Sequence, residues 1–512
     1  MSSRIIKSAG QVSGYTFISR IFGLARDVLI ANIFGAGAGY DAFLIAFKIP
    51  NFTRRLFAEG AFSQAFIPVL SEVRAKKNKY ESLKLAGNLA GCLLLVTGLI
   101  TLLVIIFAPL VVSIFAPGFI HDNLRFDLAV YMLRITFAYA LLISLVSLAG
   151  SVLNVWGYFM FGAASPILLN ISLICSAFFL SNYLTVPITS LAWGVLAGGF
   201  LQLLWMIYGL RKKRLFGKIR FTWKDHYVRK VLKLMVPALF AASIVQFNIM
   251  LDSVFASLLD AGSVSWLYYA DRLIELPVGV FGIALATVAL ANLSHDHAAG
   301  NHSAYVTKID WSVRMILIIG VPATIGLFML AEPLLITLFN YGKFSYKDIT
   351  NTSMALRAYS LGLLSFLIVK ILSSAFYAVQ DVKFPFKVAV ICTIFSVVAN
   401  LAFIPFFKHA GIALATVTAT TINCGLLMHK LRKEGTYITS YIWSGILLRI
   451  GFAALVMATA IWYFNPEVTS WLAWSAWDRL VHLLSFIAGM VLLYFFALYI
   501  AGMRLKDFKL VV

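Results

Sequence analysis

Long apolar stretches alternate with short polar ones along almost the whole chain. A helix needs about 20 apolar residues to cross the hydrocarbon core of a bilayer, and about fourteen stretches reach that length. The pattern therefore predicts an all-α polytopic membrane protein. The second stretch is too long for one straight span, and Pro50 with Asn51 predicts a kink in it. The stretches lie near residues 10–33, 40–72, 84–110, 126–153, 160–181, 187–210, 229–258, 264–293, 312–340, 354–379, 385–406, 410–430, 441–464 and 477–503.

The composition excludes a soluble protein. Of the 512 residues, 61% are hydrophobic and 12% are charged, whereas a soluble domain carries about 25% charged residues. There are 42 Lys and Arg residues against 21 Asp and Glu residues, for a net charge of +21. In a soluble protein such an excess is typical of nucleic-acid binding, but the cytoplasmic loops of membrane proteins accumulate the same residues. We therefore expect a lipid bilayer as partner and no nucleic acid.

The loops between the apolar stretches alternate in charge. The segments 74–84, 211–233, 430–435 and 503–509 are basic, whereas 34–41, 259–265 and 465–478 contain no Lys or Arg. One loop on the neutral side, 340–348, departs from the pattern with two Lys residues. Because basic loops stay on the cytoplasmic side, this alternation predicts an even number of spans with both termini in the cytoplasm.

The chain also repeats itself weakly. Residues 35–50 resemble 261–277, residues 133–156 resemble 356–379, and residues 205–213 resemble 426–434, each at a spacing of roughly 220–227 residues. Because these similar segments occur in the same order, they predict two parallel six-helix repeats, at 1–213 and 214–434, followed by two extra helices at 435–512. Parallel repeats of this kind are typical of transporters, whose substrate sites lie between the halves.

Charged residues occur inside three of the predicted spans. A charge within the bilayer is costly, and it usually faces a hydrated cavity or a partner. Because the guanidinium fork matches pairs of phosphate oxygens, a group of arginines favours a phosphate-bearing substrate. The charged residues of these three spans are Arg20, Arg26, Asp27, Asp41, Lys48, Arg54, Arg55, Glu59, Asp271, Arg272 and Glu275.

These residues fall into two expected roles. Arg20, Arg26, Arg54 and Arg272 are the predicted ligands of an anion. Asp27, Asp41, Asp271 and Glu275 are predicted to hold those arginines in place, and the spacing of Arg272 and Glu275 allows an ion pair along one helix. The alternative is that all of these charges form internal ion pairs that join helices; for Arg55 and Glu59, one turn apart, the two interpretations are equally good.

Several segments resemble the MurJ (MviN) family of lipid II flippases. They are SRIFGLARD at 19–27, GAGAGYDAFLIAFKIPN at 35–51, RRLFAEGAFSQAFIPVLSE at 54–72 and SVSWLYYADRLIELPVGVFGIALATV at 263–288. The resemblance implies the fold of the multidrug/oligosaccharidyl-lipid/polysaccharide exporter superfamily, a V-shaped pair of six-helix lobes in the bacterial cytoplasmic membrane. It implies lipid II as substrate, a lipid-tail groove in 435–512, and other cell-wall synthesis proteins as partners.

The resemblance also assigns roles to residues. It places the cavity arginines of the family on Arg20, Arg26, Arg54 and Arg272. It places the accompanying acidic residues, with supporting or gating roles, on Asp27, Asp41, Glu59, Asp271 and Glu275.

Moving a large polar headgroup across the membrane in one direction needs an energy source. The chain lacks a GxxxxGK[ST] loop, so we expect no direct use of ATP and no bound cofactor. A gradient of Na⁺ or H⁺, or the membrane potential, remains as driving force. Asp252 and Asp381 are candidate cation ligands, with helix-end charges as the alternative interpretation.

Other function classes fit less well. His295, His297 and His302 are grouped, but they lie in a short cytoplasmic loop that we interpret as solvated. No nucleophile–base pattern occurs, so we expect no enzyme. A glycan polymerase would need a large periplasmic loop with a catalytic carboxylate, and none is predicted. A flippase for another undecaprenyl-linked glycan and a cation-coupled exporter of the same superfamily remain as alternatives.

Overall fold

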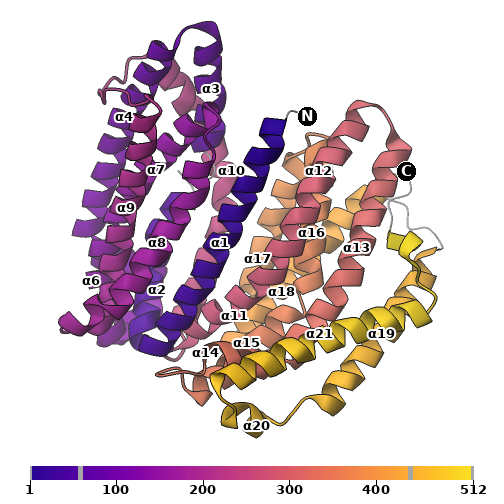
Figure 1. Cartoon of the computed structure of the whole chain (residues 1–512). Coiled ribbons are helices and arrows are strands. Elements are labelled where there is room, and N and C mark those ends of the chain that lie inside the picture. Colours follow the sequence, from indigo (N-terminus) through magenta and orange to yellow (C-terminus); the bar gives the residue numbers. More distant parts are fainter. Residues whose placement is uncertain (1–2, 56–61, 436–441, 509–512) are drawn as a thin grey trace. The chain divides into compact units, whose positions relative to one another are not determined.

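The computed structural model describes residues 3–55, 62–435 and 442–508 (Figure 1). This part of the chain is almost entirely helical and contains no β-strand, which confirms the predicted fold class. By their internal contacts the residues form two compact units: Met1–Ser265 with Gly342–Phe344, and Trp266–Tyr341 with Ser345–Val512. The predicted boundaries of the sequence repeat, at residues 213 and 434, stay predictions.

Fourteen spans were expected, and the described residues support a smaller number. Ten helical segments are long and apolar enough to cross a membrane, or eleven if one pair bent by 43° forms a single broken span. The three remaining predicted stretches contain α1 (Ser3–Phe34), α2 (Ala38–Arg54) with α3 (Phe62–Lys76), and α10 (His226–Ser257). In α1 the reason is its charge: Arg20, Arg26 and Asp27 interrupt the apolar half of the helix.

The first unit is a bundle of helices. In it α1 packs against α8, α8 against α9, α2 against α6 and α7 against α9. In the overlong second stretch α2 continues through Pro50 to Arg54 and α3 begins at Phe62, with residues 56–61 outside the described part. The kink at Pro50 and Asn51 stays a prediction. The other helices of this unit are α4 (Lys79–Ile106), α5 (Ala108–Phe115), α6 (Asn123–Thr136), α7 (Ala138–Val155), α8 (Met160–Phe178) and α9 (Ser190–Lys212).

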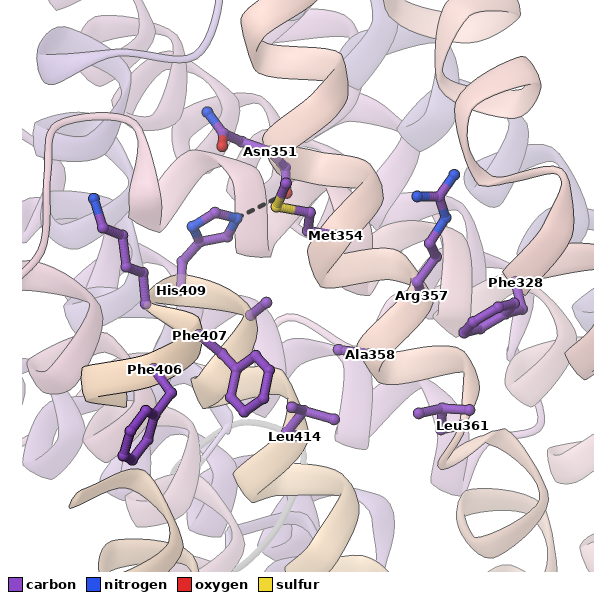
Figure 2. Close-up of a pocket in the computed structure, with 12 residues that line it drawn as sticks. Phe328, Asn351, Met354, Arg357, Ala358, Leu361, Phe406, Phe407, His409 and Leu414 are labelled. Atoms are coloured by element: carbon purple, nitrogen blue, oxygen red, sulfur yellow. Dashed lines mark hydrogen bonds between the residues drawn. The ribbon is translucent and has the colours of Figure 1, made fainter. Parts of the chain in front are cut away.

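The second unit contains the remaining helices. Here α17 packs on α18, α12 and α13 pack on α16, and an open pocket lies among α13, α15, α17 and α18 (Figure 2). The bent pair is α15 with α16. The helices are α11 (Ser263–Pro277), α12 (Ile283–Ala298), α13 (His302–Met329), α14 (Ala331–Phe339), α15 (Tyr346–Ser360), α16 (Leu363–Ala378), α17 (Lys383–Phe407), α18 (His409–Lys433), α19 (Ile442–Phe464), α20 (Val468–Ala473) and α21 (Ala476–Ile500).

The two predicted C-terminal helices are present as α19 and α21. They pack against each other, and α19 also packs against α13. Met315 of α13, Ile450 of α19 and Tyr494 of α21 belong to one buried apolar cluster. These two helices are therefore anchored to the second unit by an apolar contact surface.

Polar residues define where the helices begin. The Asn78 side chain accepts a hydrogen bond from the Glu81 N–H at the start of α4, and Asp225 accepts from two N–H groups at the start of α10. Ser345 and Asp348 form a reciprocal capping box at the start of α15. Such caps satisfy N–H groups that have no partner within the helix, so the short polar segments fix the ends of the apolar helices.

Two glycines of α4 allow another segment to cross the helix closely. The backbone of residues 218–221 runs over Gly87 and Gly91, and the Arg220 N–H donates to the Gly87 carbonyl at 3.2 Å. A Cβ atom at Gly91 would overlap the carbonyl group of Arg220. By contrast, a Cβ atom at Gly98, farther along α4, would make an ordinary contact with Leu141 at 3.5 Å.

Gly91→Ala should therefore destabilise the protein by about 1–3 kcal/mol, the usual cost of overpacking. Gly98→Ala is the matched control, and its better helix propensity should leave stability equal or slightly higher. The measurement is the Tm of each purified variant in the same neutral detergent. Equal Tm values for the two variants would show that segment 218–221 does not pack on α4 as described.

Candidate functional site

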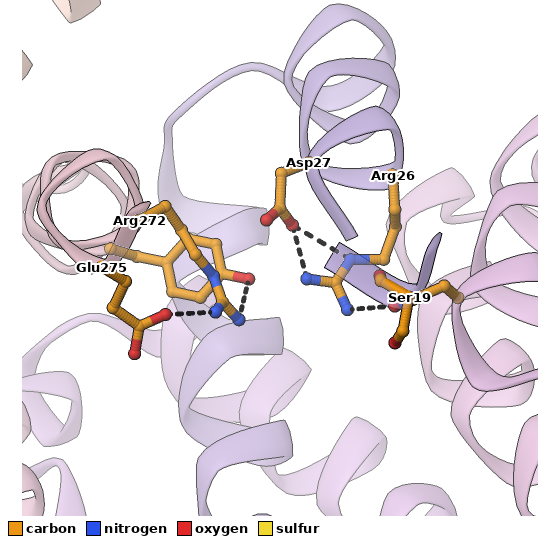
Figure 3. Close-up of polar contacts among 7 residues, drawn as sticks. Ser19, Arg26, Asp27, Arg272 and Glu275 are labelled. Carbon is orange, nitrogen blue, oxygen red and sulfur yellow. Dashed lines mark hydrogen bonds and ion pairs between the residues drawn. The ribbon is translucent and has the colours of Figure 1, made fainter. Parts of the chain in front are cut away.

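A buried ion pair joins two neighbouring residues of α1. The Arg26 Nε and Nη2 atoms lie 3.0 and 2.7 Å from the Asp27 Oδ1 atom, and Arg26 and Asp27 are only 7% and 2% exposed. The third guanidinium nitrogen, Nη1, donates to Asn170 Oδ1 of α8 at 3.0 Å. Asn170 in turn donates to the Ser19 carbonyl at 3.2 Å, which ties α8 to two turns of α1 (Figure 3).

In this network Asp27 pairs with Arg26, and its supporting or gating role stays a prediction. The two side chains of this ion pair belong to adjacent residues of α1. Arg20 is half-buried, and no hydrogen bond or ion pair is recorded for it among the residues that the structure describes. The binding of an anion by Arg20 and Arg26 stays a prediction.

Asp41 holds a turn of the backbone. It is completely buried in the first turn of α2. Its Oδ2 accepts from the Gly262 N–H at 2.7 Å, and its Oδ1 accepts from the Ser265 N–H at 2.8 Å and from the Ser265 hydroxyl. A carboxylate with three donors can stay charged at a buried position. The recorded donors are backbone and hydroxyl groups, so a role in supporting an arginine stays a prediction for Asp41.

Two other cations of α2 contact polar groups. Lys48 Nζ donates to the Ser253 hydroxyl of α10 at 2.8 Å, and Arg54 Nε donates to Asn51 Oδ1, one turn earlier, at 2.7 Å. Both cations are half-buried. Glu59, the predicted acidic neighbour, lies outside the described residues.

The predicted ion pair of α11 is present. Arg272 Nη1 lies 2.7 Å from Glu275 Oε2, and Nη2 lies 3.1 Å from the Tyr268 hydroxyl (Figure 3). The guanidinium also lies over the Tyr268 ring, 4.9 Å from its centroid, a favourable cation–π geometry. The Arg272 and Glu275 side chains are 35% and 50% exposed, and Asp271 is exposed as well. This group is therefore more open to its surroundings than the α1 pair.

The two candidate cation ligands occupy different structural positions. Asp381 accepts from the N–H groups of Lys383 and Phe384 at 3.0 and 3.1 Å and so marks the beginning of α17. Asp252 lies half-buried within α10. Among the described residues, no group of three or more His, Cys, Asp or Glu side chains is arranged to hold a metal ion. Cation binding by Asp252 and Asp381 stays a prediction.

The uncharged partners of these cations were not predicted from the sequence. Asn170 is 144 positions from Arg26, and Ser253 is 205 positions from Lys48. Asn170 stands within the apolar stretch 160–181, and an isolated amide in such a stretch is the only signal that the sequence offered. Because buried polar groups need hydrogen-bond partners, a lone amide or hydroxyl in an apolar stretch indicates a polar contact between helices.

A family model described as lipid II flippase MurJ matches residues 30–482 of the chain. The chain belongs to this family. It is 40% identical to a probable lipid II flippase MurJ of Vibrio cholerae, over 99% of this chain and 98% of that protein. It is 38% identical to the lipid II flippase MurJ of Burkholderia cenocepacia, over 97% and 98% of the two chains. The resemblance drawn from the sequence segments is thus confirmed.

The solved structures agree with this family assignment. A structure of lipid II flippase MurJ in an inward closed conformation matches with a TM-score of 0.82 and 28% identity, covering 96% of this chain and 99% of that one. An inward-facing multidrug resistance MATE transporter of the MOP superfamily matches with a TM-score of 0.67 and 15% identity, covering 82% and 95%. The second match shows the shared fold alone. MurJ proteins are flippases, so the family places the chain among transporters.

The contacts of Asp41 yield a prediction about stability. In Asp41→Asn one acceptor oxygen is replaced by an NH₂ group, so the Gly262 N–H or the Ser265 donors lose their acceptor in a buried place. The expected cost is about 1–3 kcal/mol, seen as a lower Tm of the purified protein. The exposed Asp127 provides the control Asp127→Asn, which should leave the Tm unchanged. A Tm for Asp41→Asn as high as that of the control would contradict the role of Asp41 in holding this backbone turn.

Proposed function

We propose that this protein moves lipid II from the inner to the outer leaflet of the bacterial cytoplasmic membrane by alternating access, with both termini in the cytoplasm. Family membership along nearly the whole chain supports this function. The observation that carries it is the buried guanidinium of Arg26, which Asp27 and Asn170 hold within the apolar half of α1. Placing a charged side chain inside a membrane-spanning helix costs free energy, and such a residue usually has a function.

In the proposed mechanism, Arg20, Arg26, Arg54 and Arg272 bind the pyrophosphate of the substrate in an arginine-rich cavity. Two oxygen atoms of a phosphate group can accept hydrogen bonds from two parallel N–H groups of one guanidinium. Arg26 and Arg272 already pair with carboxylates, those of Asp27 and Glu275. The substrate would take the place of these carboxylates, which would pair with the arginines again once it leaves.

The exchange of partners accounts for reversible binding. Removing one partner from a buried ion pair costs about 3–5 kcal/mol, so an arginine that only lost its carboxylate would be unstable. A pyrophosphate restores the charge balance, and the carboxylate restores it after release. Asp27, Asp41, Glu59, Asp271 and Glu275 are the proposed supporting or gating residues.

The polyprenyl tail is proposed to follow α19 and α21, because hydrocarbon needs no polar path.

A gradient is proposed to bias the direction of transport. One charge moved across 100 mV contributes about 2.3 kcal/mol, enough to favour one state of a two-state equilibrium. The coupled ion would be Na⁺ or H⁺, with Asp252 and Asp381 as candidate ligands, or the membrane potential would act directly. Other cell-wall synthesis proteins are the proposed partners.

Replacing each of the four arginines by Ala should abolish complementation of a conditional flippase mutant, because the pyrophosphate loses a charged ligand. Arg→Lys at the same positions should restore activity only in part, since an ammonium lacks the planar fork. The measurement is growth after depletion, with membrane content checked by immunoblot. Lys387→Ala, at an exposed position of α17, is the control and should complement fully. Normal growth of all four Ala variants would refute the site.

The substrate itself has a direct test. Depletion of the protein should cause lipid II to accumulate in the inner leaflet, measured by its accessibility to a lipid II-degrading colicin added outside spheroplasts. Re-expression should restore the accessible pool. If the distribution of lipid II stays unchanged while another undecaprenyl-linked glycan accumulates inside, the cargo is that glycan.

A further inference from the structure

An open pocket of about 570 Å³ lies in the second unit, and its lining includes none of the candidate site residues described above (Figure 2). That volume is within the range of about 300–1,000 Å³ that small-molecule sites occupy. Its lining comes from α13, α15, the end of α17 and the start of α18. Two cations, Arg357 and Lys408, stand in this lining, and no carboxylate does. The pocket is therefore suited to an anion.

The rest of the lining is apolar and exposed. Phe406 is 82% exposed, and Phe407, Leu361 and Met354 are about half exposed. In Figure 2 the labelled rings of Phe406 and Phe407 lie beside each other at the end of α17. Cations next to exposed aromatic and aliphatic side chains favour a ligand that is anionic at one end and apolar at the other.

The wall of the pocket is fixed in place. His409 is 4% exposed, its Nε2 atom donates to the Asn351 carbonyl at 2.8 Å, and its ring packs against Trp266 at 5.0 Å. Arg357 is held from behind by Glu332 of α14, with 2.9 Å between Nη2 and Oε1. A guanidinium has five N–H donors, so this ion pair still allows Arg357 to bind a second anion.

Lys408 has a backbone conformation that favours glycine. It is the single residue between α17 and α18, with φ 49° and ψ −128°. Glycine adopts these angles without steric cost, whereas a lysine side chain is strained there. Strained residues persist where the surrounding structure holds them, and they are found more often at functional sites. A lysine at this turn places a cation on the pocket at a cost in stability.

The charge pattern of the α17–α18 hairpin indicates which leaflet the pocket faces. The other end of this hairpin carries Lys383 together with Lys430, Arg432 and Lys433, and Lys430 lies over the Phe384 ring at 5.6 Å. A basic end of this kind belongs in the cytoplasm. The turn at Lys408 then lies at the outer leaflet. Few basic residues are expected on that side of the membrane, so the presence of both Arg357 and Lys408 in the pocket calls for an explanation.

We propose that this pocket binds an anionic phospholipid of the outer leaflet, with its phosphate at Arg357 and Lys408 and its acyl chains along Phe406 and Phe407. A membrane-embedded chain meets such lipids constantly, and one open pocket holding both cations and apolar side chains fits both ends of the molecule. The pocket shares no lining residue with the proposed flippase site, and the proposal does not depend on that site.

The test is a binding titration of the full chain in neutral detergent, followed by native mass spectrometry. The probes are dioleoyl phosphatidylglycerol, dioleoyl phosphatidylcholine and glycerol 3-phosphate. Phosphatidylglycerol should bind at least tenfold more tightly than phosphatidylcholine, and glycerol 3-phosphate should bind weakly because it has no acyl chains. Equal affinity for the two lipids, or tight binding of glycerol 3-phosphate, would overturn the proposal.

Two charge-removing variants locate the site. Lys408→Gly removes the cation and relieves the turn, so it should weaken phosphatidylglycerol binding about fivefold, the equivalent of about 1 kcal/mol per basic residue, while the Tm of the lipid-free protein stays equal or rises. Arg357→Gln combined with Glu332→Gln should weaken binding similarly without leaving a carboxylate unpaired.

The matched control is Lys347→Gln, in the first turn of α15. Lys347 is exposed and does not line the pocket. Lys347→Gln lowers the net charge by one, as Lys408→Gly does, and should keep wild-type affinity. If it weakens binding as much as Lys408→Gly does, the lipid responds to general surface charge and the pocket assignment is wrong. Unchanged binding in both pocket variants would have the same consequence.

Discussion

A charge within an apolar solvent must find its partner inside the protein, and this constraint governs the polar part of the structure. Lipid offers no hydrogen bonds, so a charged side chain buried in the helix bundle needs a partner within the protein. In the first unit Arg26 is satisfied by Asp27 and Asn170, and Asp41 by Gly262 and Ser265. In the second unit Arg272 pairs with Glu275. The bundle contacts at these places follow from the need for partners.

The same constraint explains why the helices approach closely at small residues. Without a hydrophobic driving force between spans, association depends on tight packing and on hydrogen bonds across helices. Gly194 of α9 lies against Ser176 of α8, and its carbonyl accepts from the Ser172 hydroxyl at 2.8 Å. Gly87 and Gly91 admit a loop backbone in the same way. Small residues thus contribute to stability here by allowing contacts that a larger side chain would prevent.

The sequence predicted the helical class, most of the spans and the three charged helices, because each of these depends on local apolar periodicity or composition. It also predicted the ion pair between Arg272 and Glu275, three residues apart on one helix. Contacts across large sequence separations were not predictable. The partner of Arg26 is 144 positions away, and the donors to Asp41 are 221 and 224 positions away. No local pattern specifies which turn of which helix will meet a given carboxylate.

The geometry around Arg26 shows why an arginine, and not a lysine, suits this position. Its Nε and Nη2 face one carboxylate while Nη1 faces an amide on another helix, so a single planar group has two partners in different directions. An ammonium has no such fixed fork. Any anion that binds this guanidinium along its Nε–Nη2 edge must displace Asp27, whereas the Asn170 contact can persist. Binding an anion and freeing Asp27 would then be one event, and the displaced carboxylate would carry its negative charge into the surroundings of α1. A local exchange of this kind links occupancy of the site to the electrostatics of the helix that bears it.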